Sequence, residues 1–300
     1  MDKFNSIVSK IKKIEIQGAE NVAYASVEAL EYSINVSKRI TLSSFSKEIE
    51  EKKKILFSTR PTEPCMRNAL NFITHTEAKD ISEMKKDMLR KVEQAKKHIQ
   101  FVEKTISKVG SRMIKDGTRI FTHCHSTTVM EILKKAKDQK KNFEVFNTEA
   151  RPHYQGRITA KELSSYGINV THFVDSAARL AIKHSDMVLL GCDAVTTTKA
   201  INKIGSEMFA EIAQLHKVPV YICTDSWKFD SKSIFCYDEE IEQRKASEMW
   251  KEAPKKVKIM NPIFEKIDFS NINGIISEMG LYKPEMFIEE ARVTYPYLFH

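Results

Sequence analysis

The run MVLLGC at positions 187–192 decides the fold class of this chain. Apart from Gly191, every residue in it is apolar, so the run has no polar side, which is typical of a central parallel strand covered by helices on both faces. Other β-rich runs lie before and after it, at 118–123, 143–147, 168–174 and 218–223. Helical stretches separate these strands, at 127–139, 159–166, 176–184 and 203–216. Strands that alternate with helices at this spacing predict βαβ units and a parallel sheet.

The N-terminal part of the chain has a helical pattern instead. Its clearest element is a helix predicted over 77–113, whose apolar residues recur at steps of three or four. These residues are Ile81, Met84, Met88, Val92, Ala95, Ile99, Val102, Ile106 and Val109. Asp116 and Gly117 then give a turn signal. The sequence therefore predicts an α/β protein with a helical N-terminal domain, residues 1–112, followed by a Rossmann-like parallel-sheet domain, residues 113–300.

Composition is that of an ordinary soluble protein. Hydrophobic residues make up 42% and charged residues 29% of the 300 residues, which allows a sizeable core. No apolar run approaches the roughly 18–20 residues that cross a bilayer, and the N-terminus lacks the apolar stretch of a signal peptide. We therefore expect a cytoplasmic protein without a membrane partner. The five cysteines include no CxxC pair, so reduced thiols are expected rather than a disulfide framework or a zinc module.

The charge balance points to an anionic partner. The net charge is +8 and the pI is about 9.0, which suits either nucleic acid or a phosphorylated metabolite. Runs such as KEIEEKKK at 47–54 mix both signs and indicate a solvated helix face. The sequence contains no zinc finger, RNA-recognition signature or arginine-rich arm. A phosphorylated metabolite is therefore favoured over nucleic acid.

Polar and reactive residues follow the carboxyl ends of the predicted strands. Ligands of an open parallel sheet bind beyond those ends. No GxGxxG follows the first strand and no GxxxxGK[ST] occurs, so neither a dinucleotide-binding turn nor a P-loop is supported. The residues at the strand ends are Cys124 to Thr128, Thr148 to Pro152, Asp175, Ser176, Asp193, Ala194 and Thr224 to Ser226.

Two of these residues, Cys124 and Asp193, are candidates for chemistry. A cysteine near a helix N-terminus can have a lowered pKa and react as the thiolate, whereas the alternative is a small buried hydrophobe. A carboxylate after the most apolar strand suits an acid or base whose pKa burial raises. Its alternative is a helix cap or a salt bridge. Position alone leaves both pairs of alternatives open.

Further candidates have plain structural alternatives as well. Ser126, Thr127 and Thr128 can offer backbone N–H groups to a phosphate at a helix start, but a helix N-cap is the favoured interpretation of these residues alone. Arg151 and Arg157 lie in one short loop beside Glu149 and Gln155 and suit a phosphate, or else form a surface salt-bridge cluster. The adjacent residues His123, Cys124 and His125 would point to opposite faces of a strand, so no metal site is expected.

Several blocks, in this order, resemble the initiation-factor-2B-like superfamily along essentially the whole chain. The superfamily includes methylthioribose-1-phosphate isomerases, archaeal ribose-1,5-bisphosphate isomerases and regulatory subunits of initiation factor 2B. The ARPxxQGR and NKIG blocks are quite specific to it. The matching blocks are IQGAENVA (16–23), TRPTEPCMRNAL (59–70), THCHS (122–126), EARPHYQGRITAKEL (149–163), GCDAV (191–195), INKIGSEMFA (201–210), WKF (227–229) and NPIFEKIDF (261–269).

Within the superfamily, the isomerases carry a cysteine and an aspartate at the positions of Cys124 and Asp193, a pair that the regulatory subunits generally lack. The RPTEP and ARPHYQGRITAKEL blocks are closest to the archaeal ribose-1,5-bisphosphate isomerases. The resemblance implies an aldose–ketose isomerase that converts α-D-ribose 1,5-bisphosphate to D-ribulose 1,5-bisphosphate in AMP degradation, with Asp193 as acid and Cys124 as base. It implies AMP as activator, no metal or redox cofactor, and a homo-oligomer, a dimer that can extend to a hexamer.

The same resemblance implies a set of substrate-binding residues. They are Gln17, Gly18, Ala19, Glu20, Arg60, Ser126, Thr127, Thr128, Arg151, Gln155, Asn202, Lys203 and Lys228.

Two departures from the family pattern keep alternatives open. The segment from Asp193 to Asn202 is one residue shorter than the family loop and lacks its Asn-Gly turn, and His125 stands where asparagine is common. One alternative is a non-catalytic regulatory subunit that binds a nucleotide or sugar phosphate. The other is an isomerase of another pentose 1-phosphate, such as methylthioribose 1-phosphate.

Overall fold

The computed structural model describes residues 2–13, 15–16, 18–61, 63–235, 241 and 243–299. The chain divides into two compact units. The first consists of Met1–Val102, Trp227–Phe229 and Tyr295–His300, and the second of Glu103–Ser226 and Asp230–Thr294. The division therefore falls within a long helix, and the chain enters the first unit three times. The two-domain boundary at residue 112 stays a prediction.

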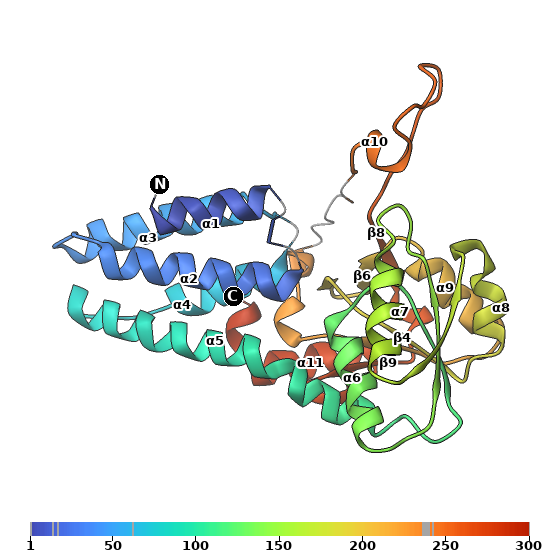
Figure 1. Ribbon diagram of the computed structural model, residues 1–300. Helices are drawn as coiled ribbons and strands as arrows, with labels where there is room; N and C mark the ends of the chain where they lie inside the picture. Colours follow the sequence, from blue (N-terminus) through green and yellow to red (C-terminus); the bar gives the residue numbers. More distant parts are fainter. Residues whose placement is uncertain are drawn as a thin grey trace. The chain divides into compact units, whose positions relative to one another are not determined.

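The first unit is helical, as the N-terminal sequence predicts (Figure 1). The apolar positions of α1 and α5 form buried stripes: Phe4 and Ile11 are at most 1% exposed, and Val92 and Ala95 are fully buried. Burial of such stripes is the main source of helix stability in a bundle. The helices are α1 (Lys3–Lys12), α2 (Ala19–Val36), α3 (Leu42–Phe57), α4 (Pro64–Thr74) and the first part of α5 (Ile81–Ser111), with the short helix η5 (Pro296–Phe299) at the end of the chain.

The second unit is built on a seven-stranded sheet with the order β10-β9-β7-β4-β1-β2-β3. All neighbouring strands are parallel except β9 and β10. Every residue of β4 is buried, so the central strand that the apolar run predicts is confirmed. The strands are β1 (Arg119–Thr122), β2 (Glu144–Thr148), β3 (Asn169–Phe173), β4 (Met187–Leu190), β7 (Val220–Cys223), β9 (Gly274–Ser277) and β10 (Gly280–Tyr282).

Helices connect the parallel strands, as expected for an α/β fold. Gly110 lies inside α5, where a Cβ atom would come within 2.6 Å of the Ile132 side chain on α6, so the glycine allows the two helices to pack closely. The helix expected from residue 159 already begins at Gln155. The helices are α6 (Thr127–Asp138), α7 (Gln155–Ser165), η1 (Asp175–Ala177), α8 (Ala178–Lys183), α9 (Ser206–Leu215), η2 (Ser226–Lys228), η3 (Ser231–Phe235), α10 (Ala246–Met249), η4 (Phe269–Asn271) and α11 (Pro284–Thr294).

A second, three-stranded sheet lies in the segment that follows Asp193. It consists of β5 (Ala194–Val195), β6 (Lys199–Lys203) and β8 (Phe264–Asp268), all antiparallel. The amide of Thr196 donates to the Lys199 carbonyl at 2.8 Å and closes the turn between β5 and β6. The segment between Asp193 and Asn202 therefore forms an ordered β-hairpin.

Among the residues that the structure describes, no helix is long and apolar enough to cross a membrane.

Candidate active site at the strand ends of the second unit

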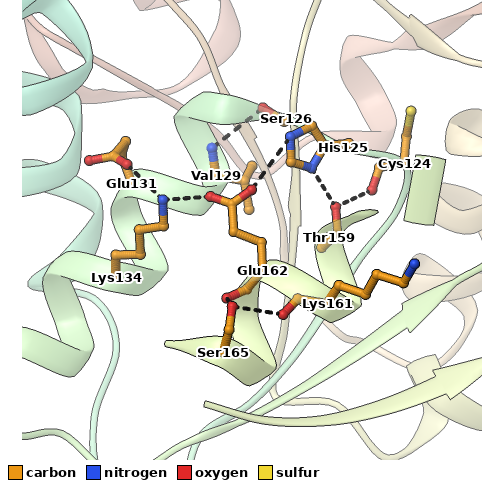
Figure 2. Close-up of polar contacts among 10 residues, drawn as sticks. All are labelled: Cys124, His125, Ser126, Val129, Glu131, Lys134, Thr159, Lys161, Glu162 and Ser165. Atoms are coloured by element: carbon orange, nitrogen blue, oxygen red, sulfur yellow. Dashed lines mark hydrogen bonds and ion pairs between the residues drawn. The ribbon is translucent and has the colours of Figure 1, made fainter. Parts of the chain in front are cut away.

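Cys124 lies two residues beyond the end of β1 and has a left-handed backbone, with φ of +64°. This conformation is uncommon for a residue with a side chain and typically marks a turn or a functional position. The residue is half-buried, and its thiol donates to Gln155 Oε1 at 3.4 Å. Its carbonyl oxygen accepts a hydrogen bond from Thr159 Oγ1 at 2.8 Å (Figure 2). One helix, α7, therefore contacts both the thiol and the backbone of Cys124.

The charge environment of Cys124 differs from the sequence-based expectation. Burial raises the pKa of the thiol to about 11, Lys203 lowers it, and Asp193 and Asp175 raise it further. The pKa is therefore raised, and not lowered as the helix start suggests, because burial of the thiol outweighs the positive charge of Lys203. The charges of Lys203, Asp193 and Asp175 therefore all act on the thiol.

The β5–β6 hairpin positions Asp193 relative to Lys203. The Asp193 amide donates to the Ile201 carbonyl at 2.9 Å across the base of the hairpin. Asp193 is half-buried, whereas Asn202 and Lys203 are each only 6% exposed. Asn202 Nδ2 donates to Ser206 Oγ at 2.9 Å, at the first turn of α9. Lys203, at the end of this hairpin, influences the pKa of the Cys124 thiol.

The residues that begin α6 behave partly as the cap interpretation predicts. Ser126 is the N-cap, and its Oγ accepts from the Val129 amide at 3.4 Å (Figure 2). Thr128 is 1% exposed, whereas Thr127 is exposed. A Cβ atom at Gly191 would lie 2.5 Å from Ser126 Oγ. Glycine at position 191 therefore lets α6 begin directly against the end of β4.

The loop between β2 and α7 is fixed by Asp175. Its carboxylate accepts from the amides of Ala150 at 2.8 Å and Arg151 at 2.9 Å. Ala150 and Tyr154 both have a positive φ, of 58° and 56°. At Gly156, a Cβ atom would lie 1.7 Å from the Thr148 carbonyl oxygen, so only glycine permits the first turn of α7 to pack against β2. This close packing explains why the chain has glycine within its QGR block.

The two arginines of this loop have different surroundings. Arg157 pairs with Glu149 and lies 4.0 Å above the Tyr154 ring, which agrees with the alternative of a surface salt-bridge cluster. Arg151 is exposed, and its guanidinium donates to the Tyr154 hydroxyl at 2.6 Å and to the Met249 carbonyl at 3.3 Å. Arg151 and Gln155 stay candidate substrate contacts.

His123 has a structural role that the sequence did not indicate. It is 2% exposed, and its ring bonds to the Ile204 carbonyl through Nε2 at 2.9 Å and to Thr148 Oγ1 through Nδ1 at 2.6 Å. Since the carbonyl can only accept, Nε2 carries the proton. Burial lowers the pKa of His123 to about 4. Both ring nitrogens of His123 form hydrogen bonds within the protein, so neither is available as a metal ligand in this structure.

Sequence reasoning also missed Thr159, and it gave Asp175 only a position at a strand end. Both act through contacts with residues far away in sequence, and the short polar side chains give no local signal. A strand-end location was the single available indication for Asp175.

The remaining predicted site residues lie in the first unit. Gly18 is the N-cap of α2, with φ of +82°, and Ala19 and Glu20 form the first turn. Lys228 is 6% exposed, and its Nζ lies 3.6 Å from Glu20 Oε1. Arg60 pairs with the buried Glu63 at 3.6 Å. Gln17 lies outside the described residues.

Asn68 explains how the WKF block is held in the first unit. Its Nδ2 donates to the carbonyls of Trp227 at 2.7 Å and Phe229 at 2.8 Å. Trp227 is 2% exposed and stacks on His98 with ring centroids 4.0 Å apart. Two of the blocks that carry the family resemblance, on α4 and at 227–229, therefore contact each other and place Lys228 beside Glu20.

Comparison with known proteins agrees with this architecture. A ribose 1,5-bisphosphate isomerase of Pyrococcus furiosus is 37% identical over 311 residues, which cover 98% of this chain and 94% of that protein. Its namesake from Thermococcus kodakarensis is 36% identical, with coverage of 95% and 92%. A 5-deoxyribose 1-phosphate isomerase of Clostridium botulinum is 31% identical, with coverage of 94% and 87%.

Among solved structures, the translation initiation factor eIF-2B of Pyrococcus horikoshii OT3 has the same fold, with a TM-score of 0.81 at 24% identity. The alignment covers 95% of this chain and 98% of that one. Residues 15–284 match the initiation factor 2 subunit family. Together with the relatives at more than 30% identity, this match confirms the resemblance: the chain belongs to the initiation factor 2 subunit family.

Proposed function

We propose that this protein converts α-D-ribose 1,5-bisphosphate to D-ribulose 1,5-bisphosphate, with Asp193 as the acid and Cys124 as the base. That the chain is a sugar-phosphate isomerase, an intramolecular oxidoreductase, follows from relatives with such names along almost its whole length. The observation that carries the choice of residues is their position. Cys124 and Asp193 lie just beyond the carboxyl ends of the neighbouring parallel strands β1 and β4, and the charge of Lys203 lowers the pKa of the Cys124 thiol.

The chemistry of the substrate explains why an acid is needed. The phosphate on C1 blocks a free aldehyde, so a lysine Schiff base cannot start the reaction. A protonated Asp193 can donate to the ring oxygen while the bond between C1 and that oxygen breaks. The proton that later leaves the C2 hydroxyl, as C2 becomes a ketone, restores the acid form of Asp193. The carboxyl group thus ends the cycle as it began.

Cys124 would move the second proton. Its thiolate takes the proton from C2, which leaves an enol phosphate between C1 and C2, and the thiol then returns that proton to C1. Because burial raises the thiol pKa to about 11, only a small fraction of Cys124 is thiolate near neutral pH. Lys203, whose positive charge lowers this pKa, would both favour the thiolate and stabilise negative charge that develops on the substrate.

The remaining site residues and the biological setting are part of the same proposal. The substrate-binding residues of the proposal are Gln17, Gly18, Ala19, Glu20, Arg60, Ser126, Thr127, Thr128, Arg151, Gln155, Asn202 and Lys228. We propose further that AMP activates the enzyme, that no metal or redox cofactor takes part, and that a cytoplasmic homo-oligomer acts in AMP degradation.

A second candidate substrate is a pentose 1-phosphate that lacks the 5-phosphate. The relative named 5-deoxyribose 1-phosphate isomerase, at 31% identity, supports this alternative. The two substrates differ in one dianionic group, the 5-phosphate. A change of the buried, positively charged Lys228 can therefore distinguish them. If Lys228 binds the 5-phosphate, Lys228→Met should weaken the binding of ribose 1,5-bisphosphate more than the binding of 5-deoxyribose 1-phosphate.

The direct test supplies ribose 1,5-bisphosphate, 5-deoxyribose 1-phosphate and methylthioribose 1-phosphate separately, with and without AMP, and follows the ketose products by NMR. We expect the highest kcat/KM for ribose 1,5-bisphosphate and a faster reaction with AMP. Turnover of only a 1-phosphate would replace the proposed substrate by the second candidate. A folded protein that converts none of the three would contradict the proposed activity and favour a regulatory subunit.

A further inference from the structure

Helix α7 contacts Cys124 at two points that lie one helical turn apart. Gln155 accepts from the thiol at 3.4 Å, and Thr159 donates to the carbonyl at 2.8 Å. Residues four apart share one face of a helix, so a single face of α7 contacts both ends of this residue. We propose that Thr159 is a positioning residue that, together with His125, holds Cys124 in its left-handed conformation and thereby fixes where the thiol points.

The hydrogen bonds of Thr159 have a defined direction. Its hydroxyl has one proton, which goes to the Cys124 carbonyl because that oxygen can only accept. The oxygen of the same hydroxyl therefore accepts from His125 Nδ1, 3.0 Å away (Figure 2). Thr159 is 2% exposed, so water has little access to replace it. Loss of the hydroxyl would leave a carbonyl and a ring N–H without this partner.

The left-handed conformation of Cys124 is unfavourable for the backbone alone. A left-handed conformation is disfavoured for a residue with a Cβ atom, and Cys124 has neither glycine's freedom nor the local side-chain hydrogen bond that helps asparagine. A return of φ to negative values would rotate the thiol away from Gln155. Contacts at the carbonyl and at the sulfur oppose that rotation from the same helix.

His125 completes the arrangement from the other side of the hydroxyl. Its Nε2 faces Glu162 Oε2 at 3.9 Å, and Glu162 in turn pairs with Lys134 at 2.5 Å (Figure 2). Burial lowers the pKa of His125, Glu162 raises it and Lys134 lowers it. Because the Thr159 proton goes to the Cys124 carbonyl, the contact between His125 and Thr159 needs a proton on Nδ1, which the ring donates to the Thr159 hydroxyl oxygen. His125 thus supplies an N–H donor to Thr159.

The test compares Thr159→Val, which removes the hydroxyl at constant shape, with Thr159→Ser, which keeps it. Thr118→Val is the matched control, since Thr118 is a 9% exposed threonine whose hydroxyl accepts the Lys115 amide at 3.1 Å at the opposite end of β1. Two readouts are used. One is kcat and KM for ribose 1,5-bisphosphate, and it rests on the proposed function. The other is the rate at which iodoacetamide alkylates Cys124, followed by peptide mass spectrometry between pH 7 and 10, and it needs no turnover.

For Thr159→Val we expect kcat to fall about 10- to 100-fold, the range expected when a reacting group is displaced by about 1 Å, with KM changed less than about twofold. Alkylation of Cys124 should become at least about threefold faster, because the thiol is no longer held against Gln155. Thr159→Ser should restore both values to within about threefold of wild type. Thr118→Val should leave both unchanged.

A Thr159→Val protein that is folded and alkylated at Cys124 with the wild-type rate and pH profile would overturn the proposal, whatever its activity. Wild-type protein that turns over no sugar phosphate would contradict the proposed function alone, because the alkylation comparison still decides the role of Thr159. If Thr159→Val does not fold, Thr159→Ala, which also removes the hydroxyl, is compared with Thr159→Ser in its place.

Discussion

Two groups of residues in the second unit share a left-handed backbone but for different reasons. Lys140 and Lys217 are exposed and follow the ends of α6 and α9, where their amides bond to carbonyls of the preceding helical turn, at 2.8 and 3.0 Å. This is the usual conformation after a helix C-terminus. Cys124 and Ala150 follow strands, and groups distant in sequence hold them: Thr159 and Gln155 of α7 for Cys124, and Asp175 for Ala150.

The difference shows where this protein uses backbone strain. At the helix ends the conformation is a local consequence of stopping a helix, and any residue that tolerates a positive φ serves. At the strand ends it is imposed by long-range side-chain contacts at the edge where ligands of parallel sheets bind. We therefore expect changes at the first group to alter stability and changes at the second to alter chemistry.

The largest effect should come from Cys124 itself. Cys124→Ser keeps the shape of the residue but replaces a thiol by a hydroxyl that ionises far less readily, so kcat for ribose 1,5-bisphosphate should fall about 10³-fold, within the range known for loss of a general base. Steady-state kinetics measure the effect, and circular dichroism verifies the fold. A Cys124→Ser enzyme with the full wild-type rate would remove Cys124 from the mechanism.

The next largest effect concerns the residue before Cys124. The pKa of His123 is lowered to about 4 from an ordinary value of 6.5, so the unfolded state binds the proton more readily. Stability should therefore fall as the pH decreases from 6.5 to 4, by up to roughly 3 kcal/mol from this group. Below pH 4 its contribution is constant.

Urea unfolding at pH 7 and pH 4.5 measures this dependence. Because carboxylates titrate in the same window, the informative quantity is the difference between wild type and His123→Gln. The variant should lose less stability than wild type on acidification, although it is less stable at pH 7. Equal losses in both proteins would show that His123 is not buried as the neutral ring.

Some features of the fold and of the candidate site can be predicted from the sequence, and others cannot. Apolar runs predicted β4 and the strands around it, because a buried parallel strand needs no information beyond its own residues. The β5–β6 hairpin was missed, since Ala194–Val195 is too short for a period and Thr196 to Thr198 do not resemble the usual Asn-Gly turn. Cys124 and Asp193 were found as strand-end residues and through the family blocks.

The raised thiol pKa could not be inferred from the sequence. It depends on burial of the thiol, and the neighbours of Cys124 along the chain suggest the opposite direction through the helix dipole. Thr159 is likewise ordinary in sequence, and its role arises because α7 begins at Gln155 and presents residues 155 and 159 on one face. Properties that depend on contacts between distant segments are those that local patterns leave undetermined.

A smaller effect should come from Lys203, the positive charge that acts on the Cys124 thiol. Lys203 lowers the pKa of Cys124 and burial raises it to about 11. If the thiolate is the base, log kcat should rise with pH between 7 and 9 with a slope near one, because the thiolate fraction increases tenfold per pH unit. Lys203→Met should raise the thiol pKa further and lower kcat about tenfold at each pH. A flat profile in wild type would mean that the thiolate fraction does not limit the rate.

The smallest effect should come from Lys140 and Lys217, the left-handed residues that follow α6 and α9. Lys140→Gly and Lys217→Gly remove a Cβ atom from a left-handed residue, and the relief exceeds the added entropy of the unfolded chain. Each variant should be more stable by about 0.5–1 kcal/mol, measured by urea unfolding, with kcat and KM unchanged. Cys124→Gly relieves the same kind of strain but removes the proposed base. A loss of activity in Lys140→Gly would contradict the separation, because it would show that a locally determined turn also controls the chemistry at the strand ends.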